Sequence, residues 1–316
     1  MMQAGTQMQN TEYKGMGTKD LIVSFATNAS FPDLARFLLS ARKFCSVETT
    51  DIVLFVEPKH HQFSELASEL RVTLIPVSSL WREISGNLVL KVLYRGLLVA
   101  LKLGADRGSP AWEQVYRATV SSWVHAMCGR HLAYQDFLKA NSIYRCVLLS
   151  DSRDVVFQSN PFGLVNPNVL NVFEQDRSLL FGGDNCDTNW FAKVYGRELV
   201  NTLSGKQTIC AGTIMGSPAI FLKYLDFMEQ EVLSHKFCPL DQAMHNKIVY
   251  CDFPRELLEF HSNLSGLIFT MGETSESDYQ IEGNQLTLKN KIVSVLHQYD
   301  RVPKIRSEIE KAYPLV

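Results

Sequence analysis

The stretch VLLSDSRDVVF at residues 147–157 decides how this chain folds. Its first apolar run predicts a buried strand that ends at Asp151, and a second apolar run begins directly after Asp154. Acids at the carboxyl end of such a strand lie where open α/β sheets bind their ligands. Two converging carboxylates stay ionised together only with a cation between them. Because Mg²⁺ and Mn²⁺ take one or two carboxylates plus phosphate oxygens, the stretch predicts a metal–diphosphate site; the alternative is an Asp-rich turn that caps the next element.

Bulk composition limits the class of protein. The chain has 316 residues, enough for one large α/β domain or two smaller ones. Charged residues make up 20% and hydrophobic residues 46%, which are ordinary values for a globular protein. A formal net charge of -2 without any run of Lys or Arg argues against nucleic acid as a partner.

The cysteines and the apolar segments bear on the compartment. Seven cysteines are scattered without a CxxC pair, and the first residues lack the apolar core of a secretory signal. This pattern predicts reduced thiols, no zinc site and a cytoplasmic location. The most apolar stretch, 87–104, is interrupted by Lys91, Arg95 and Lys102. It therefore predicts an amphipathic or core helix whose Lys and Arg side chains extend toward solvent, and no transmembrane segment.

The order of the predicted elements indicates the fold class. Strands are expected at 21–26, 51–56 and 72–77, with a helix from Pro32 after the first of them. This βαβ alternation predicts a parallel sheet covered on both faces. A helix at 129–140 leads into the acid-tipped strand. Beyond Phe162 the sequence predicts strands at 179–183 and 208–215, a helix at 221–233, a hairpin at 279–288 about a Gly-Asn turn, and a last strand at 292–296.

No linker or internal repeat divides the chain. We therefore expect a single α/β, Rossmann-like domain at 18–301, with a mostly parallel central sheet flanked by helices. Residues 1–17, rich in Gln, Gly, Thr and Met, are expected to be a disordered lead-in. Residues 302–316 are expected to be a C-terminal tail, because the sequence after Tyr299 has no strong core pattern.

Glycine-rich phosphate cradles are missing from the sequence. There is no GxxxxGK[ST] motif, and no GxGxxG motif follows the first strand. Bound phosphates would therefore have to be held by a metal and by individual cationic side chains.

In the order of its motifs the chain resembles the glycosyltransferases of the GT-A fold, which use nucleotide-sugar donors, over residues 20–301. Ala26, Thr27 and Asn28 after the first strand resemble the base-binding start of these enzymes. Arg130 resembles the donor-contacting arginine on the helix before the metal motif. Arg301 is expected to neutralise the leaving diphosphate, and a surface role is its alternative.

The acidic motif carries the resemblance further. Asp151 and Asp154 resemble the metal-binding acids, with Ser152 and Arg153 between them beside the donor. Their Asp-x-x-Asp spacing departs from the common Asp-x-Asp motif and is similar to that of the glycosyltransferase domains of lysyl hydroxylases. Glycogenin-like enzymes and lipopolysaccharide galactosyltransferases are further relatives that the pattern resembles. His297, just past the last predicted strand, resembles the third protein ligand of the metal.

Two further segments match the same family. Cys210, Gly212 and Thr213 lie in a loop that resembles the Asn-x-Gly loop beside the donor sugar, with Cys where Asn is usual. Asp241 and Gln242 resemble the acidic pair that faces the transferred sugar, which makes them the expected catalytic residues.

Each of these residues also has a plainer interpretation. Arg130 shares a helical face with Tyr134, so it can point at the strand end, but it can equally pair with a surface acid. His297 can be a structural histidine, and Asp241 can be an N-cap. Trp190, expected in a polar loop, can stack on an acceptor sugar or be a buried anchor.

The resemblance implies a metal-dependent hexosyltransferase that uses Mn²⁺ (or Mg²⁺) and a nucleotide sugar, with UDP and a retaining outcome favoured and a glycan or other small acceptor. A phosphatase-type hydrolase with Asp151 as nucleophile and Asp154 as acid is one alternative. A non-catalytic sugar-nucleotide-binding module is another, kept open by Cys210. If one metal site exists, His297 lies within bridging reach of Asp151 or Asp154 although more than 140 residues separate them.

Overall fold

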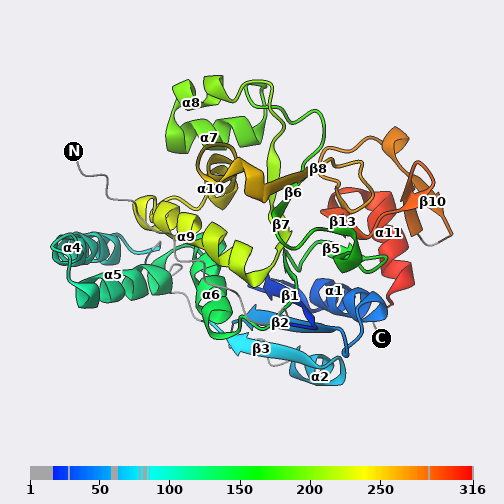
Figure 1. Ribbon diagram of the computed structural model, residues 1–316, viewed down its shortest axis with the longest axis horizontal. Helices are drawn as coiled ribbons and strands as arrows, with labels where there is room; N and C mark the ends of the chain where they lie inside the picture. The colour runs from blue at the N-terminus through cyan, green and yellow to red at the C-terminus, as the bar shows by residue number, and fades with distance from the viewer. Residues whose placement is uncertain are drawn as a thin grey trace, which may run out of the picture.

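A seven-stranded sheet of order β3-β2-β1-β4-β7-β6-β8 forms the centre of the computed structural model (Figure 1). The structure describes residues 17–314 except 28, 58–62, 78–79, 81–83, 85 and 284. Strands β3, β2, β1 and β4 run parallel, whereas β7 is antiparallel to both β4 and β6. The predicted α/β, Rossmann-like architecture with a mostly parallel sheet is confirmed. The strands of this sheet are β1 Asp20–Phe25, β2 Thr50–Val56, β3 Val72–Pro76, β4 Val147–Ser150, β6 Leu170–Glu174, β7 Ile209–Gly216 and β8 Leu258–His261.

Helices cover both faces of this sheet. Leu34 and Phe37 of one group pack with Ile22, whereas Leu132 and Tyr224 of the other pack with Val23. Apolar side chains on both faces explain why the strands are continuous apolar runs. The first group is α1 Phe31–Phe44 and α2 Phe63–Glu69; the second includes α6 Ala126–Ala140 and α9 Pro218–Ser234. The predicted helices at 32, 129–140 and 221–233 are α1, α6 and α9.

A smaller layer at the carboxyl end of the chain completes the fold. One three-stranded sheet has the order β5-β13-β9 and another the order β10-β11-β12. The predicted hairpin is present as β10 and β11, although Asn284 of its turn lies outside the described residues. The last predicted strand is divided into β12 and β13. The bounds are β5 Val155–Phe157, β9 Ile268–Thr270, β10 Gln280–Glu282, β11 Gln285–Leu288, β12 Lys291–Ile292 and β13 Val295–His297.

Two expectations for the middle of the chain are wrong. No strand forms at 179–183, where Leu180 makes only an isolated bridge to Gln207, and the sequence reading missed β6. The supposed polar loop before Trp190 is helix α7, Cys186–Tyr195, because the Asn185 side chain accepts a hydrogen bond from the Thr188 N–H and starts a helix. Two short helices follow, α8 Arg197–Thr202 and α10 Asp241–Lys247.

The predicted helix at 87–104 is α4, Leu88–Ala105, which pairs with α5, Pro110–Trp123, at one end of the molecule (Figure 1). It is not a core helix, since most of its apolar side chains are exposed. In the described part of the chain, no helix is long and apolar enough to span a membrane. All seven cysteines are unpaired, and Cys186 and Cys251 are exposed.

The expectation of a C-terminal tail without core residues is wrong. Helix α11, Pro303–Ala312, buries Ile305 and Ile309 in a cluster with Tyr299 of the segment before it. The sequence reading missed this helix because it has only two buried positions, one turn apart.

We predict that Ile305→Ala lowers the free energy of unfolding by about 2–5 kcal/mol, because Ile305 is 2% exposed and its loss leaves a cavity. Urea denaturation measures the change. The exposed neighbour Lys304 provides the control: Lys304→Ala should change the free energy by less than about 0.5 kcal/mol. Equal effects of the two substitutions would show that α11 is not part of the core.

Candidate metal centre

Backbone pairing brings three predicted metal ligands together. The Asp151 N–H donates to the Gly212 carbonyl oxygen at 2.8 Å, which fixes Asp151 against β7 of the large sheet. In the small sheet, β13 pairs with β5 so that His297 lies opposite Val155. The Asp154 carbonyl oxygen accepts from the N–H of Gln298 at 2.7 Å. The two sheets therefore place Asp151 on one side of a gap and Asp154 with His297 on the other.

The side chains of this triad converge on one point. His297 Nε2 lies 3.5 Å from Asp151 Oδ2 and 3.9 Å from Asp154 Oδ1. The proximity predicted from the sequence is confirmed. At bond lengths of about 2.1 Å around an octahedral ion, neighbouring ligand atoms are about 3.0 Å apart and opposite ones about 4.2 Å. The observed separations fall between these limits, so the triad has the dimensions of a cation site.

The donor atoms of the triad fit a hard divalent cation. Carboxylate oxygens suit Mg²⁺ and Mn²⁺, and an imidazole nitrogen suits transition metals, so this mixed set of donor atoms has the chemistry of a divalent-cation site. His297 Nε2 is buried and has no hydrogen-bond partner. An orphaned buried nitrogen that faces two acids is the observation expected of a ligand atom. Among the described residues, this is the group of His, Cys, Asp and Glu side chains with metal-ligand spacing.

Burial and the neighbouring charges shift the pKa values of all three side chains of the triad. Burial raises the pKa of Asp154 above its ordinary value. Partial burial would also raise the pKa of Asp151, but the Arg130 guanidinium and the His297 ring lower it. Burial opposes a charge on His297, yet Cys210 and the two acids raise its pKa well above the ordinary value. The acids thus favour a positive charge at the position of the ring, whether from a proton or from a metal ion.

The other ring nitrogen of His297 is held in place from behind. Its Nδ1 lies 3.4 Å from Thr270 Oγ1 and 3.4 Å from Cys210 Sγ. In a neutral ring, a proton on Nδ1 shared with these groups leaves the Nε2 lone pair directed at the acids. This is the arrangement that orients metal-binding histidines. Cys210 thus lies behind the histidine, and it also lines a cavity beside the triad.

Gly212 makes room for the triad. A Cβ at this position would lie 2.6 Å from Asp151 Oδ2 and 2.7 Å from His297 Cε1. Both distances are far below van der Waals contact, so no larger residue fits without moving a ligand. The site therefore requires glycine at position 212 because of the close approach of Asp151 and His297. Gly212 lies within strand β7 and not in a loop.

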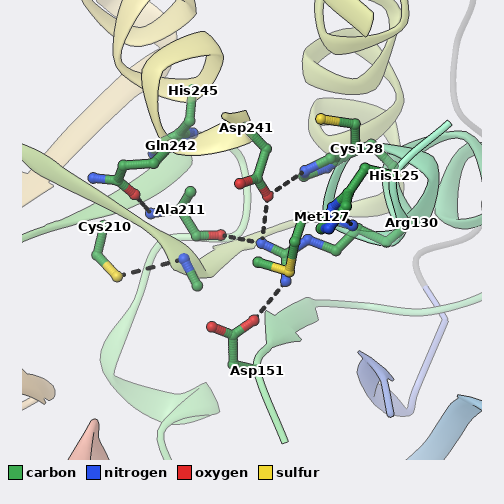
Figure 2. Close-up of polar contacts among 12 residues, drawn as sticks. His125, Met127, Cys128, Arg130, Asp151, Cys210, Ala211, Asp241, Gln242 and His245 are labelled. Atoms are coloured by element: carbon green, nitrogen blue, oxygen red, sulfur yellow. Dashed lines mark hydrogen bonds and ion pairs between the residues drawn. The ribbon is translucent and has the colours of Figure 1, made fainter. Parts of the chain in front are cut away.

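Arg130 joins the triad to a second buried acid, as Figure 2 shows. Its Nη1 donates to Asp151 Oδ1 at 2.5 Å, and its Nη2 donates to Asp241 Oδ2 at 2.8 Å. The predicted direction of Arg130 toward the strand end is confirmed. The nearby surface acid on the same helix, Asp136, pairs with Arg117. Because both Nη groups are bonded to acids, Arg130 acts on the site mainly by fixing Asp151.

Asp241 and Gln242 hold helix α10 against β7. Asp241 is buried, opens α10 as its first residue and is not the N-cap. Gln242 accepts from the Ala211 N–H at 2.8 Å and donates to the Ile209 carbonyl oxygen at 2.7 Å. Both residues line a cavity beside the triad, but Oδ2 of Asp241 and the side-chain amide of Gln242 are bonded to protein atoms.

Two cavities meet at the triad. The first, which we call the β7-side cavity, has a volume of about 330 Å³ and is lined by Asp187, Trp190, Gly212 and Gln242 among others. The second, the β1-side cavity, has a volume of about 240 Å³ and lies past the end of β1. The residues common to both walls are Met127, Arg130, Asp151, Arg153 and Asp154. A ligand that spans both cavities would cross the two acids.

The remaining predicted donor residues divide into two groups. Thr27 and Ser152 line the β1-side cavity, and Arg301 lines the β7-side cavity. Arg153 reaches both with an exposed side chain whose Nη2 is 3.6 Å from Asp154 Oδ2. Ala26 and Thr213, which were also expected to contact the donor, are buried and line neither cavity. Asn28 lies outside the described residues.

Three residues of the centre were not predicted. Thr270 orients His297, because the parallel pairing of β9 and β13 places the two side by side. His131 Nε2 lies 3.4 Å from Asp241 Oδ2. Asp187 lines the β7-side cavity and accepts from Gln175 Nε2 at 2.9 Å. The position of His131 next to Arg130 on the predicted helix was a usable signal, whereas Thr270 depends on a strand pairing that the sequence does not reveal.

Comparison with known proteins adds no relative: no family model matches the chain, and no curated protein matches its sequence.

We predict that Gly212→Ala weakens Mn²⁺ binding by about 10–100-fold, the range seen when the surroundings of metal ligands are altered. The reason is the overlap of the new methyl group with Asp151 and His297. Calorimetric titration with Mn²⁺ measures the affinity. Gly163→Ala is the matched control, since a Cβ there would meet no atom within 4 Å. Unchanged affinity in Gly212→Ala would contradict a metal between these side chains.

We predict that Arg130→Met lowers the free energy of unfolding by about 3–5 kcal/mol, because it leaves the buried Asp241 without its counter-ion. Adding Asp241→Asn to the variant should recover part of this loss. Arg177→Met, which breaks an exposed pair with Asp278, should cost no more than about 1 kcal/mol. A loss in Arg130→Met as small as that of this control would exclude a supporting role for the ion pair.

Proposed function

We propose that this chain is a metal-dependent glycosyltransferase of the GT-A type. It would transfer a hexosyl group from a nucleotide sugar, with a UDP-sugar favoured, to a glycan or another small acceptor. The observation that carries the proposal is the position of Asp151 and Asp154 between two cavities, with His297 beside them in the wall of the β7-side cavity. Such a position suits a substrate whose two halves are joined by a diphosphate.

The β1-side cavity is the proposed place of the nucleotide. It lies at the carboxyl end of β1, where open α/β sheets bind nucleotides. Phe25 offers a ring and Thr27 a polar edge in its wall, and Met127 and Ala126 add apolar surface. The exposed guanidinium of Arg153, beside the acids, is placed to interact with a phosphate.

The β7-side cavity is the proposed place of the transferred sugar and the acceptor. Its walls combine Asp187 and Gln242 with the half-exposed indole of Trp190, a mixture suited to sugar hydroxyls and to the face of a pyranose ring. Arg301 adds a positive charge on the same side. We expect a glycan acceptor to approach over Trp190.

We assign metal-binding roles to three residues and positioning roles to four others. Asp151, Asp154 and His297 would hold Mn²⁺ or Mg²⁺, which supplies Lewis-acid stabilisation of the departing nucleoside diphosphate. Arg130 fixes the Asp151 carboxylate, and Thr270 fixes the His297 ring. Because Asp241 is paired with Arg130 and Gln242 with the β7 backbone, we assign both a positioning role beside the sugar.

The hydrolase alternative is less well supported. A nucleophilic Asp151 would need a free oxygen, but Oδ1 is bound by Arg130 and Oδ2 faces His297. A phosphatase would release inorganic phosphate from simple phosphate esters. A non-catalytic module would bind the nucleotide sugar without consuming it. Product analysis on a panel of nucleotide sugars with Mn²⁺ distinguishes all three.

We predict that Asp154→Asn and Asp151→Asn each lower Mn²⁺-dependent release of UDP by at least about 100-fold, comparable to the loss of one group that stabilises charge in a transition state. The reason is the loss of one anionic ligand from the ion that holds the diphosphate. Asp184→Asn, an exposed acid-to-amide change outside the triad, is the control. Wild-type turnover in both triad variants would remove the metal assignment.

We predict that UDP and Mn²⁺ together raise the Tm more than either does alone. A ligand at 100 times its Kd stabilises the folded state by about 2.7 kcal/mol. Differential scanning calorimetry with and without EDTA makes the comparison. Equal stabilisation by UDP in EDTA would mean that the diphosphate is not held through a metal, and a shift with GDP or CDP instead would change the donor while leaving the site intact.

A further inference from the structure

Helix α4 exposes a continuous apolar surface. Seven of its aliphatic side chains, between 42% and 77% exposed, form what we call the α4 apolar face: Leu88, Val89, Val92, Leu93, Leu97, Val99 and Leu103. None of the residues that the structure describes covers them. Scattered exposed apolar residues are ordinary, but a contiguous group of this kind usually marks a binding surface.

The packing of α4 explains why this face is left over. Its buried side chains, Tyr94, Leu98 and Leu101, form a narrow stripe on the side that packs against the rest of the protein. Tyr94 stacks on Trp123 of α5 with ring centroids 4.5 Å apart. At 100° per residue, the apolar face covers more than a third of the helix circumference on the other side. A helix that is apolar nearly all round is expected to be covered on more than one side.

Basic residues border the face along one edge. Lys91, Arg95 and Lys102 fall within about 40° of one another around the helix, between the buried stripe and the apolar face. Helix α4 contains no acid, although the whole chain has a net charge of -2. Arg95 lies over the Phe237 ring at 5.1 Å, and Lys102 bonds to Asp106 at the end of the helix. With the charge of Lys102 offset by Asp106, Lys91 and Arg95 give this basic edge a local positive charge.

A tryptophan on the neighbouring helix extends the surface. Trp112 of α5 is 48% exposed and packs on Gly104, where a Cβ would come within 2.8 Å of the indole. Tryptophan is enriched where proteins meet the boundary between lipid and water. Figure 1 shows α4 and α5 side by side at one end of the molecule, so a flat surface can approach them.

We propose that the α4 apolar face docks the protein on an anionic membrane surface. The helix would lie in the plane of the interface, with its aliphatic side chains among the acyl chains and its basic edge at the headgroups. A second copy of the chain fits less well: an antiparallel twofold contact through this face would bring the basic edges of both copies together, and a parallel one would offer neither edge an acid on the partner helix. The proposal does not depend on the proposed glycosyltransferase activity.

Flotation with lipid vesicles tests the proposal on the full chain. The protein should float with phosphatidylcholine vesicles that contain phosphatidylglycerol, should bind pure phosphatidylcholine at least tenfold more weakly, and should be released by salt. The variant Leu93→Ser/Leu103→Ser should lose at least tenfold in binding while its circular dichroism stays unchanged. Leu164→Ser, which alters a 61% exposed leucine outside α4 and α5, is the matched control. Lys91→Gln should weaken binding to the anionic vesicles alone.

Three results would overturn the proposal that the α4 apolar face binds a membrane surface. The first is equal flotation of the wild-type protein and Leu93→Ser/Leu103→Ser. The second is absence of flotation with either vesicle. The third is a wild-type dimer in sedimentation that this variant converts to a monomer, which would assign the face to a second copy of the chain.

Discussion

The structure depends on neutralising negative charge where the carboxyl end of β4 meets the amino-terminal half of β7. Asp154 and Asp241 are buried there and Asp151 is partly exposed, so three carboxylates lie within one small region. An ionised group out of water costs several kcal/mol unless an opposite charge compensates it. Arg130 compensates Asp151 and Asp241, and His297 faces Asp154 and Asp151. Arg153 approaches Asp154 only at 3.6 Å with an exposed side chain, so the buried part of the triad can still accommodate a further cation.

The elements around this region are arranged to hold the charges in place. Antiparallel pairing of β4 with β7 aligns Asp151 with Gly212, the one residue small enough to lie beside it. The Gln242 amide bonds to the β7 backbone on both its oxygen and its nitrogen, and this fixes the start of α10, where Asp241 meets Arg130. Rigid backbone pairing therefore sets the carboxylate positions, and precise positions are what a metal site requires.

The sequence predicted the parts of this arrangement that depend on local patterns. Continuous apolar runs identified β1, β2, β3 and β4, because strands buried on both faces have no polar alternation. The proximity of Asp151, Asp154 and His297 was predicted because chemistry and resemblance coincided at strand ends. Strand β6, helix α11 and the role of Thr270 were not identified, since each depends on partners far away in the sequence. Likewise, the sequence does not predict that the side chains of Ala26 and Thr213 are buried in the core.

The Asp-x-x-Asp spacing has a structural reason. Asp151 belongs to the large sheet through its bond to Gly212, whereas Asp154 belongs to the small sheet through the Gln298 N–H. The two intervening residues let the chain turn from one sheet to the other, and β5 begins at Val155 directly afterwards. His297 reaches the same point from β13. A cation held by the triad would therefore connect both sheets across their junction, so its binding would stabilise the fold as well as the site.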